Sequence, residues 1–196
     1  MDLGALDYKY YFMKKIIGLT GSYASGKDAA ADYLVSLGFK KYVYSDYIRE
    51  ELKKIGKEPN RDNLIWMGNE LRSQFGPGEI SKRILNDIKK DRMKKAVAVG
   101  IRNPSEVEEL KKSHILHLWF VDAPQELRYE RSQKRKVLKD QVGFEQFQAQ
   151  EEKENSENTT AQQLRKVAEM ADKTLINDGR MEKLHQQIDE LLNLPS

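Results

Sequence analysis

The sequence predicts an α/β domain whose parallel sheet is covered by helices on both faces. Short apolar segments alternate along the chain with segments of helical spacing, and this order is typical of strands joined by right-handed helical crossovers. Residues 96–100 are continuously apolar, as in a strand that is buried from both sides. Ligands of such sheets bind at the carboxyl ends of the strands, so the residues after each strand are the first candidates for a site.

The chain begins its regular pattern with two strands and two helices. Residues 15–20 form a short apolar run that ends in glycine, and apolar residues at helical spacing follow as far as residue 37. Residues 39–44 are aromatic and β-branched, which favours a second strand. We expect Asp46 to cap the next helix, over residues 47–54.

The middle of the chain predicts three helices and two strands. Helices at 60–75 and 79–90 are separated by a Gly-Pro-Gly turn, and the apolar run at 96–100 is the third strand. Pro104 stands where a proline favours the first turn of a helix, and residues 115–121 form a fourth apolar strand.

The last third contains a polar excursion. Pro124 opens a helix, and the sequence after it has little capacity to build a core, so we expect a charged, mostly helical lid at about 129–160. A short strand at 173–176 and an amphipathic helix at 181–192 end the pattern. At the other end, residues 1–12 show no clear period and we expect them to be an extension.

The composition indicates a single domain, at residues 13–196. The 196 residues are 39% hydrophobic and 33% charged, which excludes disordered and collagen-like classes. No apolar run approaches the ~20 residues of a membrane helix, so we expect no membrane contact. The net charge of +3 argues against nucleic acid as a partner. The absence of cysteine excludes a disulfide scaffold and a thiol nucleophile and agrees with a reducing compartment. We expect a cytoplasmic monomer or homodimer.

The glycine-rich segment at 21–28 carries the strongest functional signal. It reads Gly-Ser-Tyr-Ala-Ser-Gly-Lys-Asp between a predicted strand and a predicted helix, and so matches G-x-x-x-x-G-K. Gly21 and Gly26 allow the backbone to wrap a phosphate, the following helix adds its positive end, and Lys27 bridges the terminal phosphates. The pattern predicts an ATP site. A glycine turn before an ordinary helix is the alternative.

Asp28 stands where this loop usually has Ser or Thr, whose hydroxyl binds Mg²⁺. A carboxylate also suits this hard cation, which makes Asp28 the candidate metal ligand. Without the cation, the carboxylate would repel the triphosphate. The alternative is that Asp28 only stabilises the first turn of the helix through its dipole.

Three further arginines follow predicted strands or precede turns. Asp46 and Arg49 lie after the second strand, and Arg49 has the geometry to bind a phosphate in bidentate fashion. Arg72 precedes the Gly-Pro-Gly turn, and Arg102 ends the apolar third strand beside the glycine loop, which makes it the best candidate for a second phosphate. For Asp46 and Arg49 a helix cap and a surface arginine remain the alternative.

Arg128, Arg131 and Arg135 share one face of the helix that begins at Pro124. A solvated basic face explains such a run by itself. Beside a phosphate loop, the same face can supply the positive charge that phosphoryl transfer needs over the migrating group.

Several motifs occur in one order along the chain. They are Gly-Leu-Thr-Gly-Ser-Tyr-Ala-Ser-Gly-Lys-Asp, Ser-Asp-x-x-Arg, Gly-Asn-Glu-Leu-Arg, Gly-Ile-Arg-x-Pro-x-Glu-Val, Val-Asp-Ala-Pro and Ile-Asn-Asp-Gly. From Met13 to Leu192 the chain resembles an archaeal-type P-loop kinase family of uncertain activity, related to dephospho-CoA kinases and to adenylate kinase-like nucleoside and deoxynucleoside monophosphate kinases. The resemblance implies a three-layer α/β/α P-loop NTPase fold, a five-stranded sheet of order 2-3-1-4-5, an acceptor-binding helical insert at about 45–92 and a helical lid.

The resemblance also assigns roles. Arg128 and Arg131 match lid arginines that act with Lys27 in catalysis, and Arg102 matches an arginine that holds the acceptor phosphate. The residues implied to bind ATP are Gly21, Ser22, Tyr23, Ala24, Ser25, Gly26, Lys27, Asp28, Ala29, Asn177 and Gly179, and those implied to bind the acceptor are Asp46, Arg49, Arg72 and Arg102. One departure is Val99, because relatives commonly carry an acidic residue there that helps to position Mg²⁺.

These features predict Mg²⁺-dependent transfer of the ATP γ-phosphoryl group to a small nucleotide-like acceptor, most simply a nucleoside or deoxynucleoside monophosphate. Transfer to a sugar hydroxyl, as in dephospho-CoA kinases, is the alternative, with Asp46 as the base. An ATP-binding sensor with little turnover is the alternative from another class, and Val99 and Asp28 are its support. An ATPase acting on RNA or protein is a further alternative.

Overall fold

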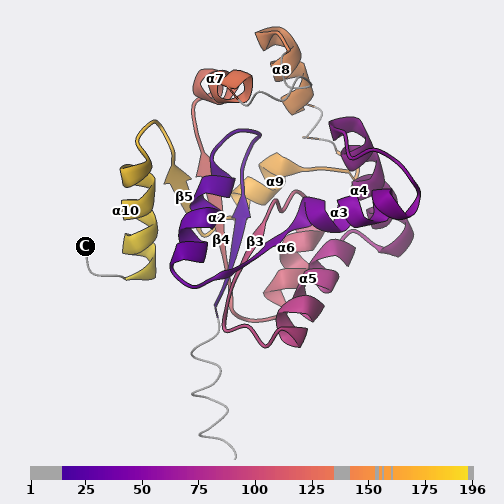
Figure 1. Cartoon of the computed structure of the whole chain (residues 1–196), viewed down its shortest axis with the longest axis horizontal. Coiled ribbons are helices and arrows are strands. Elements are labelled where there is room, and N and C mark those ends of the chain that lie inside the picture. The colour runs from indigo at the N-terminus through magenta and orange to yellow at the C-terminus, as the bar shows by residue number, and fades with distance from the viewer. Residues whose placement is uncertain (1–14, 135–141, 153–154, 156, 160, 194–196) are drawn as a thin grey trace, which may run out of the picture.

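Five parallel strands form the central sheet in the order β2-β3-β1-β4-β5, which confirms the predicted order. The computed structural model describes residues 15–134, 142–152, 155, 157–159 and 161–193. The strands are β1 (Lys15–Thr20), β2 (Lys40–Val43), β3 (Lys95–Val99), β4 (Leu116–Asp122) and β5 (Lys173–Ile176). Because every pairing is parallel, all carboxyl ends meet at one edge of the sheet, at the top in Figure 1.

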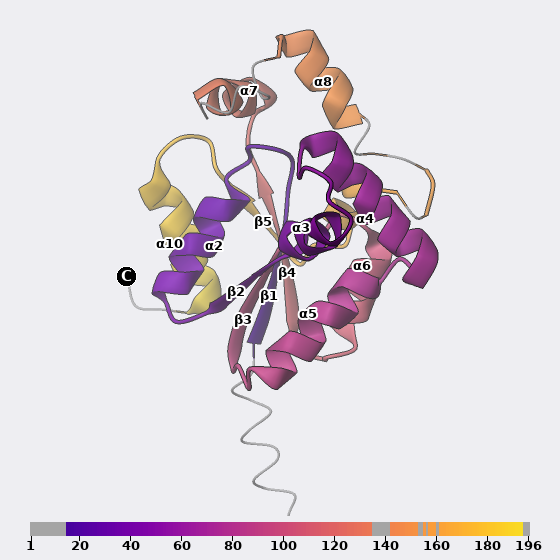
Figure 2. The ribbon, with the colours of Figure 1, turned by 45° about the vertical axis from the view of Figure 1, so that its right-hand side comes forward.

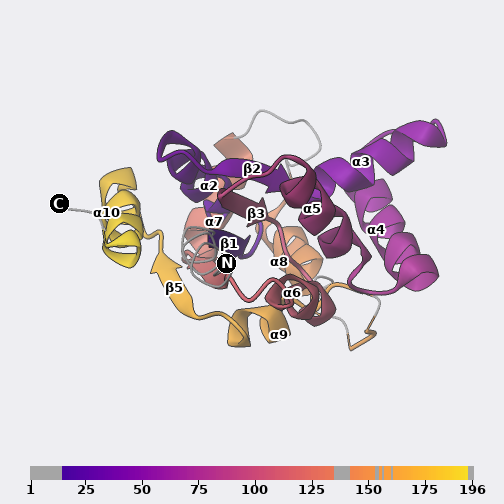
Figure 3. The same ribbon diagram turned by 90° about the horizontal axis from the view of Figure 1, so that it is seen from below.

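Helices lie on both sides of the sheet and confirm the three-layer α/β/α fold (Figures 1 and 3). On one side are α2 (Lys27–Ser36) and α10 (Met181–Leu192). On the other are α3 (Tyr44–Lys54), α4 (Arg61–Phe75), α5 (Glu79–Lys90), α6 (Pro104–Lys111) and α9 (Leu164–Glu169). The remaining described helices, α7 (Gln125–Lys134) and α8 (Phe144–Glu152), stand beyond the carboxyl ends of the strands (Figure 2).

The strands divide their apolar side chains between two cores. Along β1, Ile16 packs in the core that includes α3 to α6, whereas Ile17 and Leu19 pack in the core of α2 and α10. The same alternation occurs in β3, where Val97 and Val99 face α2 and α10. A strand that is buried on both faces has no polar side, and this is why β3 is apolar from Ala96 to Val99.

The second strand is shorter than predicted. It ends at Val43, and α3 begins at once with Tyr44, whose buried hydroxyl lies 2.5 Å from Ser81 Oγ. The prediction that Asp46 caps this helix is wrong: Asp46 lies within the first turn, and the N-cap position, Val43, has no side-chain cap. The aromatic Tyr44 continues the strand pattern, but its contact with α5 sets its conformation. The sequence pattern also did not predict α9.

The predicted lid region contains the end of α7 and all of α8. Phe147 of α8 is buried and its ring lies 5.7 Å from that of Tyr129 on α7. The predicted roles of residues 1–12 and of Arg135 lie outside the described residues. Among the helices that the structure describes, none has the length and apolar character needed to cross a membrane.

Candidate functional site

The glycine loop connects β1 to α2 at the carboxyl edge of the sheet. Gly21 has a φ of +148° and Gly26 a φ of +98°, and positive φ values favour glycine. A Cβ atom at Gly21 would overlap the Val121 carbonyl oxygen, and one at Gly26 would overlap the Asn177 side-chain amide. Both glycines are therefore required by close packing as well as by backbone angle.

Helix α2 begins inside the loop. Gly26 occupies its N-cap position without a side-chain cap, so amides of the first turn remain available as donors to an anion. Lys27 is 9% exposed, Asp28 follows it in the first turn, and both line the central cavity described below. The loop thus places one cation and one carboxylate at the positive end of a helix.

The loop also contains a buried polar group without a partner. Within the described part of the chain, Ser25 Oγ is the one buried side-chain oxygen or nitrogen that makes no hydrogen bond. Leaving such a group unpaired costs about 1–3 kcal/mol. A phosphate held by the loop amides would accept a hydrogen bond from this hydroxyl. The loop residues therefore fit the phosphates of ATP, and Asp28 fits the accompanying Mg²⁺.

Asn177 and Arg131 support the loop from outside. The Asn177 side chain, just after β5, donates to the Ser25 carbonyl at 2.8 Å, and its backbone amide donates to the Asp122 carbonyl at 2.8 Å. Arg131 Nη2 donates to both the carbonyl and the side-chain oxygen of Asn177 at 3.1 Å. Burial lowers the pKa of Arg131 from its ordinary value. Gly179 is exposed, and a Cβ atom there would meet nothing within 4 Å.

Arg128 and Arg131 share one helix face in the sequence pattern, but their side chains contact different partners. Arg128 is 8% exposed, its Nε donates to the Ala123 carbonyl at 2.9 Å, and Nη1 forms an ion pair with Glu151 of α8. Gln125 also contacts Glu151, at 2.9 Å. Arg128 thus joins α7 to α8, while Arg131 joins α7 to the loop.

A cavity of about 530 Å³ extends from the loop to the helices on the far side of the sheet edge. Lys27 and Asp28 line it at the loop, and Arg49, Arg72 and Arg102 line it elsewhere. Its other lining residues are Tyr23, Lys41, Val43, Tyr44, Ser45, Ile48, Leu64, Ile65, Gly68, Val99, Gly100 and Gln162. The structure therefore brings together the glycine loop and three arginines that come from separate elements.

Asp46 and Arg49 pair with each other on α3. Arg49 Nη1 lies 2.7 Å from Asp46 Oδ1, and the two side chains are 46% and 60% exposed. Arg49 also donates to Ser45 Oγ at 2.6 Å. Of this pair, only Arg49 is among the described residues that line the cavity. Its exposed ion pair is weak and can exchange for a ligand anion.

Arg102 and Arg72 are held more firmly. Arg102 follows β3, is partly buried, and its Nη1 donates to Gln162 Oε1 at 3.2 Å. Arg72 of α4 is 3% exposed, and its Nη2 lies 2.9 Å from Glu106 Oε1, a carboxylate that is itself fully buried. Both arginines reach the cavity wall, but the charge of Arg72 is already paired.

Val99 and Tyr44 make an apolar and neutral part of the wall. Val99 is the last residue of β3 and is almost fully buried. Burial, together with the nearby Glu106 carboxylate, holds the pKa of Tyr44 well above its usual range. Its hydroxyl contacts Ser81, which donates to the Glu106 carbonyl at 2.8 Å. At neutral pH, Tyr44 therefore adds no charge to the cavity.

Sequence reasoning assigned no role to Glu106, Asn103 or Gln162. Asn103 caps α6 and Glu106 completes a capping box with it, so the order Asn-Pro-Ser-Glu carried a readable signal for this turn. Gln162 had no such signal, because it reaches the cavity only through tertiary packing.

Relatives by sequence identify the family. No family model matches the chain. A UPF0200 protein of Sulfurisphaera tokodaii is 33% identical over 178 residues, which cover 91% of this chain and 96% of that protein. The chain belongs to the UPF0200 family. A second UPF0200 protein, from Pyrococcus abyssi, is 30% identical over 184 residues and is matched over 95% of its length. A UPF0200/UPF0201 protein of Archaeoglobus fulgidus is 33% identical over 182 residues, and there the chain spans 55% of the relative's length.

Solved structures show the fold of this UPF0200 chain. Shikimate kinase from Bacteroides thetaiotaomicron superposes with a TM-score of 0.58 at 15% identity, over 92% of this chain and 99% of that one. Dephospho-CoA kinase from Campylobacter jejuni gives a TM-score of 0.50 at 20% identity, over 92% and 97% of the two chains. At such identities the likeness establishes the P-loop kinase fold, while activity must be argued from the site.

Proposed function

We propose that this UPF0200 protein transfers the terminal phosphoryl group of ATP to a nucleoside or deoxynucleoside monophosphate. The observation that carries the proposal is the continuous cavity, about 530 Å³ in volume, that joins Lys27 of the loop to Arg49 and Arg102. Transfer between two phosphates requires positive charge around both. The loop supplies it for ATP and the two arginines supply it for the acceptor.

The chemistry needs little from the protein beyond position and charge. An oxygen of the acceptor phosphate attacks the γ-phosphorus, the bond to the β,γ-bridging oxygen breaks, and the products are ADP and a nucleoside diphosphate. Lys27 and the loop amides stabilise the charge that develops on the transferred group. Mg²⁺, held by the ATP phosphates and Asp28, would add neutralising charge.

The set of carboxylates favours a phosphate acceptor over a hydroxyl. A hydroxyl must lose a proton as it attacks and so calls for a base, whereas the monophosphate is already anionic. Asp28 is the one carboxylate among the described residues that line the cavity. Asp46, the candidate base for a hydroxyl acceptor, is paired with Arg49 at 2.7 Å.

Two regions take part in this proposal. The insert at about 45–92 would bind the acceptor, since it contributes Arg49, Arg72 and the apolar residues between them. The region at about 129–160 would act as a lid. Arg128, just before this region, forms an ion pair with Glu151 that fixes α8 to α7, and Arg131 reaches the loop through Asn177. Closure over the phosphates would exclude water and so limit hydrolysis.

The test is ADP formation from Mg-ATP across a panel of ribonucleoside and deoxynucleoside monophosphates and dephospho-CoA, with Lys27→Ala as the blank. Stimulation by one or a few monophosphates supports the proposal, and Lys27→Ala should reduce it by at least about 100-fold. Stimulation by dephospho-CoA alone would move the acceptor to a sugar hydroxyl. Tight ATP binding without stimulation by any acceptor would indicate a sensor, and Val99 would then be the residue to exchange for Asp.

A further inference from the structure

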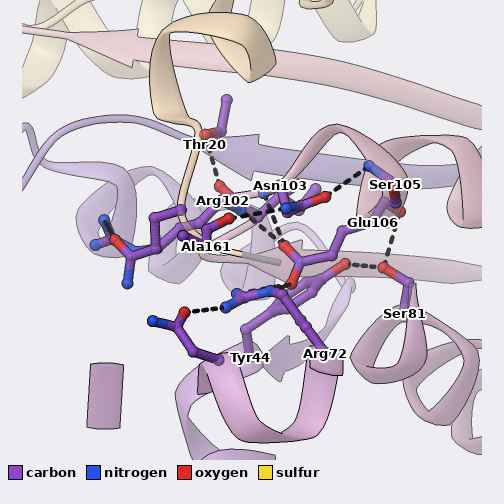
Figure 4. A network of polar contacts seen from close by, with 12 residues as sticks. Thr20, Tyr44, Arg72, Ser81, Arg102, Asn103, Ser105, Glu106 and Ala161 are labelled. Atoms are coloured by element: carbon purple, nitrogen blue, oxygen red, sulfur yellow. Dashed lines mark hydrogen bonds and ion pairs between the residues drawn. The ribbon is translucent and has the colours of Figure 1, made fainter. Parts of the chain in front are cut away.

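One buried carboxylate, that of Glu106, contacts both Arg72 and Arg102, which line the acceptor side of the cavity. Glu106 lies in the first turn of α6 and is fully buried. Its Oε1 accepts from Nε and Nη2 of Arg72 at 3.0 and 2.9 Å, and its Oε2 accepts from the backbone amides of Arg102 and Asn103 at 2.8 and 3.1 Å (Figure 4). Four donors thus converge on one side chain, from α4 and from the turn after β3.

The same turn holds a third element. The Asn103 side chain donates to the Ala161 carbonyl at 2.8 Å (Figure 4). It also donates to the Thr159 carbonyl at 2.7 Å. Next to them, Gln162 lines the cavity and accepts from Arg102 Nη1 at 3.2 Å. Residues 159 and 161–163, which precede α9, are therefore anchored on the turn that Glu106 holds.

The three elements are distant in sequence, and each places one polar or charged side chain in the cavity wall. These side chains are Arg72 from α4, Arg102 from the turn after β3, and Gln162 from the segment before α9. A buried ion pair is weak evidence for stability, because apolar residues of similar volume often serve as well. Glu106 does what an apolar residue cannot, since it orients a guanidinium and two backbone amides at the same time.

We propose that Glu106 is the positioning residue of the acceptor site, which sets the spacing of Arg72, Arg102 and Gln162 around the acceptor's anionic group. The inference rests on the proposed function, because the wall it organises is the acceptor wall. None of the contacts to Glu106 described above involves Lys27 or the glycine loop. Removal of the Glu106 carboxylate should therefore weaken acceptor binding and leave ATP binding unchanged.

The test compares Glu106→Gln with a matched control, Glu109→Gln, on the same helix. Glu109 pairs with Lys112 at 2.6 Å and does not line the cavity. Glu106→Gln replaces one of the two accepting oxygens by an NH2 group that cannot accept a hydrogen bond, and it removes the charge that pairs with Arg72, so we expect the acceptor KM to rise about tenfold or more. The ATP KM should stay within about twofold, and Glu109→Gln should change neither. Glu106→Asp keeps the charge but is one methylene shorter, and it should give an intermediate acceptor KM.

Two outcomes would overturn the inference while leaving the kinase activity intact. One is an unchanged acceptor KM in Glu106→Gln, and the other is an equal rise for ATP and acceptor, which indicates a general structural defect. If Glu106→Gln does not fold, Glu106→Asp decides by the same criteria.

A readout without turnover separates this inference from the proposed function. Hydrogen exchange at the Arg102 and Asn103 amides, and across 161–163, should speed up in Glu106→Gln and not in Glu109→Gln; unchanged exchange overturns the inference. If the wild-type protein binds a monophosphate without phosphorylating it, only the proposed transfer is contradicted. The ratio of the monophosphate Kd values of wild type and Glu106→Gln would then still decide the role of Glu106. A wild type that binds no monophosphate contradicts both.

Discussion

On the loop side of the cavity, Lys27 is placed by the backbone of two glycines, whereas on the proposed acceptor side Arg72 and Arg102 are placed by the side chain of Glu106. Gly21 and Gly26 allow the loop to lie against Val121 and Asn177 without intervening Cβ atoms. Glu106 instead collects donors from two separate elements. Substitutions that add atoms at Gly21 or Gly26 should therefore impair ATP binding, and substitutions that remove a charge should impair binding on the proposed acceptor side.

The first way to test this contrast is to add one methyl group on the loop side. Gly26→Ala places a Cβ against the Asn177 amide at a φ of +98°. We expect ATP affinity to fall by about 100-fold or more, equivalent to about 2.8 kcal/mol, in titrations followed by calorimetry. Gly38→Ala is the matched control, because its φ is +87° but a Cβ there meets nothing within 4 Å. If Gly38→Ala impairs ATP binding equally, backbone strain and not the contact with Asn177 is responsible.

The next test removes a charge on the acceptor side. Arg102→Ala should raise the acceptor KM about 10- to 150-fold, the range expected for a charge-assisted hydrogen bond of about 1.5–3 kcal/mol. The ATP KM should change little, because Lys27 and the loop remain intact. Steady-state kinetics with each substrate varied in turn measure the two effects. Equal increases in both constants would remove Arg102 from the acceptor site.

A smaller effect is expected at the boundary of the two sides, where Asp28 lines the cavity. Asp28→Ala should lower the apparent Mg²⁺ affinity by at least about tenfold, since even outer-shell partners of metals contribute this much. Asp28→Ser restores the hydroxyl that is usual in such loops and should retain most activity. Mg²⁺ titrations of turnover measure both variants. A wild-type Mg²⁺ response in Asp28→Ala would show that Asp28 only stabilises the helix.

The smallest effect concerns pH and the helices that we propose to bind the acceptor. Glu51 of α3 accepts from Lys54 at 2.9 Å and from Arg83 of α5 at 2.6 Å. Lys54 first, and then Arg83, lower the pKa of Glu51 from its ordinary value. A carboxylate whose folded pKa is lowered stabilises the fold above its unfolded pKa, and this stability is lost as the pH falls through the folded pKa.

Glu51→Gln should therefore reduce the free energy of unfolding by no more than about 1 kcal/mol at neutral pH. The difference from wild type should shrink as the pH falls below the pKa of an unfolded glutamate, and it should disappear once the pH is below the lowered folded pKa of Glu51. Urea unfolding at several pH values measures it, and added salt should reduce it. A difference that persists unchanged at acid pH would contradict an ionic origin.

Most of the fold was predictable because its signals are local. The periods of apolar residues located all five strands, and the glycine pattern located the loop. The clearest miss in an element boundary is at Tyr44, which continues an aromatic strand pattern but begins α3. Its hydroxyl contacts Ser81, 37 residues away, and no pattern within the strand contains that partner.

The sequence by itself determined the glycine loop, the alternation of strands and helices, and the set of basic residues available to a phosphate. These features depend on residues that are close in sequence, because glycine itself permits positive φ values and the period of apolar residues is read from a short stretch of chain. Only the tertiary structure decided the partners of Arg72, Arg128 and Arg131. Arg128 pairs with Glu151, Arg131 binds Asn177, and Arg72 pairs with Glu106. The reason is physical: a guanidinium binds whichever acceptor the packing of distant elements brings within about 3 Å, and helical spacing carries no information about that acceptor.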